Sequence, residues 1–190
     1  MSLNLQQIDR SWTLFIDRDG VVNIEKQDDY VCSWEEFHFY PDALGSLAYL
    51  STRFARILMV TNQRGVAKGR MSEEDLRDIH RHMLQAIVLS GGRIDRIYTC
   101  TDPDDRSPRR KPNPGMGLEA KIDFPELDFA KSVMLGNRPG DMHFGRNLGM
   151  KTIYLRTTHP EQGDDADLVD LAFDSLSALA SALRLAEHGL

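Results

Sequence analysis

The feature that most constrains the fold of this chain is a regular alternation of short apolar runs with longer segments of helical periodicity. Five runs are apolar at consecutive positions, as expected for parallel strands that helices cover on both faces: residues 12–16, 56–60, 96–100, 132–135 and 151–155. Residues 168–173 form a weaker sixth candidate. Because strands and helices alternate, we predict an α/β fold built on a doubly wound, Rossmann-like parallel sheet.

The segments between these runs carry the start and stop signals of helices. Ser72 can cap a helix whose first turn is acidic, and an apolar stripe at helical spacing then runs to the pair Gly91 and Gly92. Other helices are expected after Pro41 and Pro139 and from Ser175 onward, and Pro114 is a further helix start that the sequence allows.

Length and composition indicate one domain. With 190 residues, of which 41% are hydrophobic, residues 1–190 are expected to fold as a single unit. No apolar run approaches the roughly 20 residues of a membrane span, and the first ten residues lack the basic-then-apolar order of a signal peptide. Cys32 and Cys100 offer no disulfide framework. We therefore expect a cytoplasmic protein with no membrane partner.

The net charge of −6 restricts the kinds of partner. A nucleic-acid partner would need a basic face, and no long block of one sign is present. A small anionic substrate remains compatible with this charge, because a local pocket can be cationic on an acidic protein. The six histidines form no metal-binding or triad pattern and are expected to be structural or solvated.

In doubly wound sheets, active sites form at the carboxyl ends of the strands, so the residues after each apolar run are the candidates for reactive groups. The first run is followed by Asp17-Arg-Asp19-Gly20, whose two carboxylates can point into one crevice or form only a surface turn. The second is followed by Thr61-Asn62-Gln63, which offers neutral donors to phosphate oxygens or forms an ordinary polar loop.

Two later runs end in charged segments. After the third run, Pro112 stiffens the segment that contains Arg110 and Lys111, so that Lys111 is either a fixed cation or part of a solvated basic turn. The fourth run leads through Asn137 to Asp141 on the first turn of a predicted helix, where a carboxylate is at least a favourable partner of the helix dipole.

Taken in this order, the four segments resemble the motifs of the haloacid dehalogenase superfamily of phosphohydrolases, over roughly residues 12 to 175. The resemblance implies a phosphatase in which Asp17 attacks phosphorus and forms an aspartyl-phosphate. Asp19 would protonate the leaving alkoxide and then deprotonate the hydrolytic water. Thr61 and Lys111 would hold the equatorial phosphoryl oxygens.

The resemblance also implies a magnesium site. A carboxylate that approaches a phosphate dianion is repelled unless a cation lies between them, and Mg²⁺ prefers oxygen ligands. The implied ligands are Asp17, Asp19, Asn137 and Asp141. The family pattern has an aspartate at position 137, so the asparagine should weaken Mg²⁺ binding. It also leaves open a phosphate-binding module with weak catalysis.

Finer sequence detail narrows the branch of the superfamily. The segments 15–23, 61–69 and 110–116 resemble the histidinol-phosphatase-like subfamily, and within it the heptose bisphosphate phosphatases. The resemblance implies a small phosphorylated sugar, D-glycero-D-manno-heptose 1,7-bisphosphate, contacted by Asn62, Gln63 and Arg110. Histidinol phosphate is the nearest alternative substrate, and 3′-phosphorylated polynucleotides fit the acidic charge poorly. We expect a monomer or weak oligomer.

Two departures from the family are expected. The stretches from Asp17 to Thr61 and from Thr61 to Lys111 are filled by the predicted elements, so we expect a capless enzyme. The subfamily often carries a zinc loop, but residues 100–109 hold one cysteine and no histidine, so no structural zinc is expected. Residues 30–40 would either fold over the site as a flap or pack on the surface.

Overall fold

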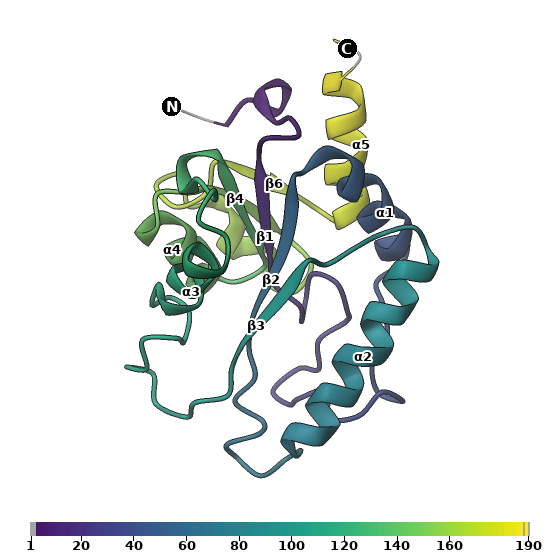
Figure 1. The fold of residues 1–190 in the computed structure, drawn as a ribbon, viewed down its shortest axis with the longest axis vertical. Coiled ribbons are helices and arrows are strands. Elements are labelled where there is room, and N and C mark those ends of the chain that lie inside the picture. Colours follow the sequence, from purple (N-terminus) through teal and green to yellow (C-terminus); the bar gives the residue numbers. More distant parts are fainter. Residues whose placement is uncertain (1–2, 188, 190) are drawn as a thin grey trace.

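The computed structural model describes residues 3–187 and 189 and confirms the predicted α/β fold (Figure 1). Six parallel strands form one sheet in the order β3-β2-β1-β4-β5-β6. The strands are β1 (Thr13–Ile16), β2 (Arg56–Asn62), β3 (Arg96–Cys100), β4 (Ser132–Gly136), β5 (Lys151–Leu155) and β6 (Leu171–Phe173). The chain therefore builds one half of the sheet outward from β1 and then returns to the other side of β1 to build the second half.

Helices cover both faces of the sheet, which makes it doubly wound. Three helices pack on one face: α1 (Ala43–Arg53), α2 (Glu73–Leu89) and α5 (Leu176–Glu187). The other face is covered by α3 (Gly115–Asp123) and α4 (Pro139–Asn147). Because side chains alternate along a strand, Leu14 and Ile16 enter the first core and Phe15 enters the second. Short 3₁₀ turns occupy Leu5–Gln7, Phe129–Lys131 and Pro160–Asp164.

Helix α2 begins and ends where its sequence signals predict. The Ser72 hydroxyl accepts the backbone N–H of Asp75, and the Asp75 carboxylate accepts the backbone N–H of Ser72 at 2.8 Å, which is a capping box. Its apolar stripe is buried, and Gly91 takes a positive φ of 81° just beyond the helix. The helix is thereby anchored along the face that supports the first two strands.

The second strand is longer than the sequence pattern predicts. Its last two residues, Thr61 and Asn62, lie opposite Thr99 and Cys100 of β3, so the ladder continues to the end of β3. Polar side chains there had indicated a loop, but the backbone pairing available from the neighbouring strand extends β2 through them. Thr61 and Asn62 are therefore presented from a strand end and not from a loop.

The strand order reverses between β1 and β4, where a crevice opens at the carboxyl edge of such sheets. Ile16, the last residue of β1, pairs with Met59 on one side and Leu135 on the other, so β4 ends one residue beyond β1 and β2 ends three residues beyond it. Between β1 and β3 the described chain holds only loops, the helices α1 and α2 and the strand β2, so it contains no inserted cap domain there. Within the same residues, no helix combines the length and apolar character needed to cross a membrane.

Candidate active site

A cavity of about 610 Å³ opens at this carboxyl edge, and we call it the active-site cavity. Its walls bring together side chains from all four predicted segments: Asp17, Asp19, Asn62, Gln63, Arg110, Lys111 and Asp141. Thr61 and Asn137, the two remaining predicted site residues, are buried and do not line it. The strand-end rule thus predicted correctly which segments converge.

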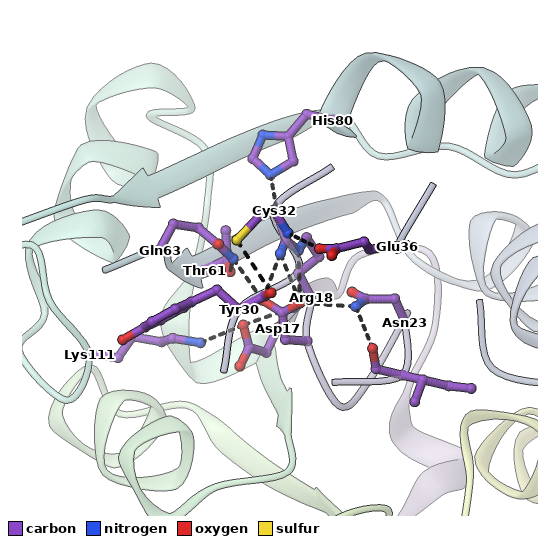
Figure 2. Close-up of polar contacts among 12 residues, drawn as sticks. Asp17, Arg18, Asn23, Tyr30, Cys32, Glu36, Thr61, Gln63, His80 and Lys111 are labelled. Atoms are coloured by element: carbon purple, nitrogen blue, oxygen red, sulfur yellow. Dashed lines mark hydrogen bonds and ion pairs between the residues drawn. The ribbon is translucent and has the colours of Figure 1, made fainter. Parts of the chain in front are cut away.

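In the cavity, one buried lysine contacts two carboxylates, and Figure 2 shows its contact with Asp17. The Lys111 Nζ is 2.9 Å from Asp17 Oδ1 and 2.7 Å from Asp141 Oδ1, and its side chain is only 2% exposed. Burial opposes the lysine's charge, but Asp141 and Asp17 outweigh burial and raise the Lys111 pKa. Burial, helped by the nearby Asp141 charge, raises the pKa of Asp17 to about 7 although Lys111 opposes the shift.

Asn62 holds the backbone of that lysine. Its Nδ2 donates to the Lys111 carbonyl and its Oδ1 accepts the Lys111 N–H, both at 3.1 Å. The amide of Asn62 therefore already has a backbone partner on each side. Asn62 therefore contributes to the site by fixing the loop that presents Lys111. A contact of Asn62 with a ligand at the cavity wall would be additional to these two backbone contacts.

The carboxylate of Asp19 is fixed by several donors. Arg18 Nη2 donates to Oδ1 at 2.8 Å and to Oδ2 at 2.9 Å, Asn23 donates to Oδ1 at 2.9 Å and Gln63 donates to Oδ2 at 2.7 Å. Burial opposes ionisation, but Arg18 and the neutral donors outweigh it and hold the pKa of Asp19 below its usual value. Gln63 also donates to Thr61, which links that buried hydroxyl to Asp19.

Arg18 itself is completely buried, which sequence reasoning missed. The sequence analysis assigned Arg18 no role, whereas in the structure its guanidinium contacts Asp19 and lies 6.0 Å from the centroid of the Phe37 ring. The ring of His80, from α2, approaches Arg18 Nη1 at 3.3 Å (Figure 2). The only sequence signal was a positive residue between two negative ones. His80 is half-buried and structural, as predicted for the histidines.

The residues after β4 are held by the start of α4. Asp141 Oδ2 accepts the backbone N–H groups of Asn137 at 3.2 Å and of Arg138 at 3.1 Å. Gly136 allows this, because a Cβ there would lie 2.3 Å from the Asp141 side chain. Both oxygens of Asp141 are thus occupied by Lys111 and by backbone donors.

Asn137 adjoins the turn after β1. Its Nδ2 donates to Thr158 Oγ1 at 3.0 Å, while its Oδ1 is buried and finds no hydrogen-bond partner among the described residues. Gly20, at a φ of 78°, packs so closely that a Cβ would lie 1.9 Å from Asn137 Nδ2. A buried carbonyl oxygen without a partner is costly unless something else binds it.

The donor chemistry of this region fits a magnesium ion. Within the described part of the chain, no three His, Cys, Asp or Glu residues are grouped as a metal site. Asparagine side chains and backbone carbonyls can also bind a hard cation, and the Asn137 side chain and the Asp19 carbonyl would be such donors here. Hard oxygen donors of this kind, with the carboxylate of Asp17, suit Mg²⁺ and not zinc.

The wall of the cavity carries both basic and acidic side chains, among the latter Glu25, Asp28 and Asp29. Arg110 Nε pairs with Asp105 at 3.0 Å, and Arg64 pairs with the same carboxylate. The Nη1 of Arg110 is buried without a partner among the residues described, so one of its donors is available. Lys26, Lys68 and Arg138 also line the cavity.

The segment of residues 30–40 contacts both the cavity and α2. Its first part, including Tyr30, lines the cavity. Its second part packs on α2, where the Trp34 ring stacks on His82 and on Phe37, with 5.2 Å between centroids in each case. Cys100 is buried in β3, as expected for a strand residue.

Comparisons with known proteins agree with this geometry. A family model described as HAD-hydrolase-like matches residues 108–179. The D-glycero-alpha-D-manno-heptose-1,7-bisphosphate 7-phosphatase of Mycobacterium bovis is 34% identical over 175 residues, which is 90% of this chain and 91% of the relative. The chain therefore belongs to the haloacid dehalogenase superfamily and is a phosphatase.

Within that superfamily the chain lies in the branch that contains the heptose bisphosphate phosphatases. The crystal structure of D,D-heptose 1,7-bisphosphate phosphatase from B. bronchiseptica, complexed with magnesium and phosphate, is similar with a TM-score of 0.82 and 28% identity. The alignment covers 91% of this chain and 98% of that one. The histidine biosynthesis bifunctional protein HisB of Bacteroides fragilis is 36% identical over 75% of this chain, but only 39% of HisB is covered.

Proposed function

We propose that this phosphatase hydrolyses a small phosphorylated sugar, D-glycero-D-manno-heptose 1,7-bisphosphate, through an aspartyl-phosphate intermediate. The observation that carries the proposal is the buried contact of Lys111 with both Asp17 and Asp141 at the point where the strand order reverses. A cation fixed beside a carboxylate can hold phosphoryl oxygens while that carboxylate attacks phosphorus.

In the first step, Asp17 attacks phosphorus and the bond from phosphorus to the sugar oxygen breaks. Both polar contacts of the Asp17 carboxylate, from Lys111 and from the Arg18 N–H, go to Oδ1, so Oδ2 is the oxygen that we assign to attack. Asp19 gives a proton to the departing alkoxide, which avoids release of a strongly basic leaving group. Because its donors favour the ionised form, Asp19 takes up that proton from solvent or from the substrate phosphate before this step. The products of this step are the dephosphorylated position of the sugar and phospho-Asp17.

In the second step, Asp19 takes a proton from a water molecule that attacks the phosphorus of phospho-Asp17. Phosphate leaves and the Asp17 carboxylate is regenerated. The donors around Asp19 favour its ionised form, which is the form that must accept this proton. Gln63 acts here by orienting Asp19, and through it Thr61 is linked to the same carboxylate.

Mg²⁺ would be held by the Asp17 carboxylate, the Asp19 carbonyl and the Asn137 side chain. When bound, it neutralises charge between the incoming carboxylate and the phosphoryl group. The contacts of Asp141 favour a supporting role, in which it positions Lys111 and the start of α4, over the direct coordination that the sequence suggested.

Arg110, which lines the cavity, supports a substrate with two phosphates. While one phosphate reacts at Asp17, the second would be bound by Arg110, whose Nη1 has no partner among the described residues. The names of the relatives favour a heptose carrying phosphates at positions 1 and 7, with hydrolysis at position 7. HisB keeps histidinol phosphate as the nearest competing substrate.

A substrate panel tests this proposal. Heptose 1,7-bisphosphate, histidinol phosphate and 3′-phosphorylated DNA would be compared with Mg²⁺ present and after EDTA. We expect the highest kcat/KM for the bisphosphate, with dependence on Mg²⁺. Faster hydrolysis of histidinol phosphate would transfer the assignment to that substrate.

The matched variants are Asp17→Asn and Asp102→Asn. Asp17→Asn removes the nucleophile and should abolish turnover and phosphoenzyme formation. Asp102 is an exposed acid in the loop before Arg110, and its substitution should leave activity near the wild-type value. Full activity in Asp17→Asn would disprove the covalent route.

A further inference from the structure

Position 137 poses a chemical problem that an aspartate would not have. The two oxygens of a carboxylate are equivalent, so either can coordinate a metal ion. An amide has one oxygen and one NH₂ group, and only the oxygen can coordinate. If the Asn137 amide were turned the other way, it would direct N–H donors toward the cation. An asparagine at this position therefore needs a neighbour that fixes its orientation.

Thr158 is placed to be that neighbour. It lies in the loop after β5, and its Oγ1 accepts the Asn137 Nδ2 at 3.0 Å. The Asn137 residue is fully buried, so bulk water does not satisfy its amide. With the nitrogen paired to Thr158, the oxygen is the remaining group, and it is buried without a partner in the described part of the chain.

A threonine hydroxyl oxygen can accept a hydrogen bond, and that of Thr158 accepts from the Asn137 Nδ2. Thr157 donates to the Gly20 carbonyl at 2.5 Å and so holds the glycine that packs against the same amide.

We infer that Thr158 is a positioning residue that orients the Asn137 amide so that Oδ1 serves as a metal ligand. The inference rests on the magnesium site of the proposed function. Neighbours that orient a ligand commonly change metal affinity by tenfold or more when removed. The effect here is specific to an amide ligand, because a carboxylate at position 137 would not need to be oriented.

The test is a double-mutant cycle on metal binding in the absence of substrate. Mg²⁺ would be titrated by calorimetry into the wild type, Thr158→Val, Asn137→Asp and the double variant. We expect Thr158→Val to raise the Mg²⁺ Kd about tenfold when residue 137 is asparagine. In the Asn137→Asp background the same change should alter the Kd by less than about twofold, because either oxygen can coordinate.

Thr158→Ser retains the hydroxyl and should restore the wild-type Kd, which a purely steric defect would not allow. Equal losses in the two backgrounds, or none in either, would overturn the inference. Absence of Mg²⁺ binding in all four proteins would overturn it as well. Failure of the proposed function is separate, because it would appear as missing turnover in the substrate panel while the Mg²⁺ titrations still report on Thr158.

Discussion

Replacement of His80 by glutamine should remove a pH dependence of stability that arises from its contact with Arg18. A guanidinium can only donate, so the His80 Nε2 that lies 3.3 Å from Arg18 Nη1 must accept, and the ring is neutral in the folded protein. Burial, reinforced by the Arg18 charge and opposed by Asp19, lowers the pKa of His80 from its usual 6.5 to about 3.

The direction of the effect follows from proton binding. As the pH falls through 6.5 the unfolded chain gains a proton on His80, whereas the folded protein does so only near pH 3. Between these values the unfolded state binds more protons, so stability falls as the pH falls. From pH 7 to pH 5 the loss attributable to this histidine is at most about 2 kcal/mol. Any folded pKa below about 4 gives nearly the same loss.

Urea unfolding of the wild type and of His80→Gln at pH 7 and pH 5 measures this contribution. Glutamine retains an acceptor for Arg18 and does not titrate, and carboxylates common to both proteins cancel in the comparison. The wild type should lose up to about 2 kcal/mol more than the variant. The same substitution at His143, which is exposed on α4, should behave as wild type. Equal losses in wild type and His80→Gln would refute the buried neutral histidine.

Two further predictions concern ligand binding. Arg110→Ala should reduce kcat/KM for the bisphosphate more than for a small monophosphate. Arg106 is an exposed arginine in the same loop, and Arg106→Ala should change kcat/KM for neither substrate. Equal reductions for both substrates in Arg110→Ala would show that Arg110 does not bind a second phosphate. Asn137→Asp should lower the Mg²⁺ concentration for half-maximal activity, because it restores a negative charge to the ligand set. An unchanged Mg²⁺ titration would exclude residue 137 as a ligand.

The sequence alone determined the sheet, the helices and the edge at which the site forms. Strands apolar at consecutive positions must be covered on both faces, which requires a parallel sheet with helices on each side. Parallel strands end at a common edge, so residues after different strands converge even when they are far apart in the chain. That reasoning brought Asp17, Lys111 and Asp141 together before any contact was known, and the ion pairs of Lys111 confirm it.

Only the tertiary structure revealed the residues that hold those groups in place. Arg18 and His80 are 62 positions apart, Asn62 braces Lys111 from 49 positions away, and Thr158 contacts Asn137 across 21 positions. The polarity of each residue indicates whether that residue is buried, so apolar periodicity in the sequence predicts which side of a helix or strand faces the core. The pairing of one donor with one acceptor depends instead on where several loops meet after the whole sheet has packed. No period in the sequence encodes that meeting point.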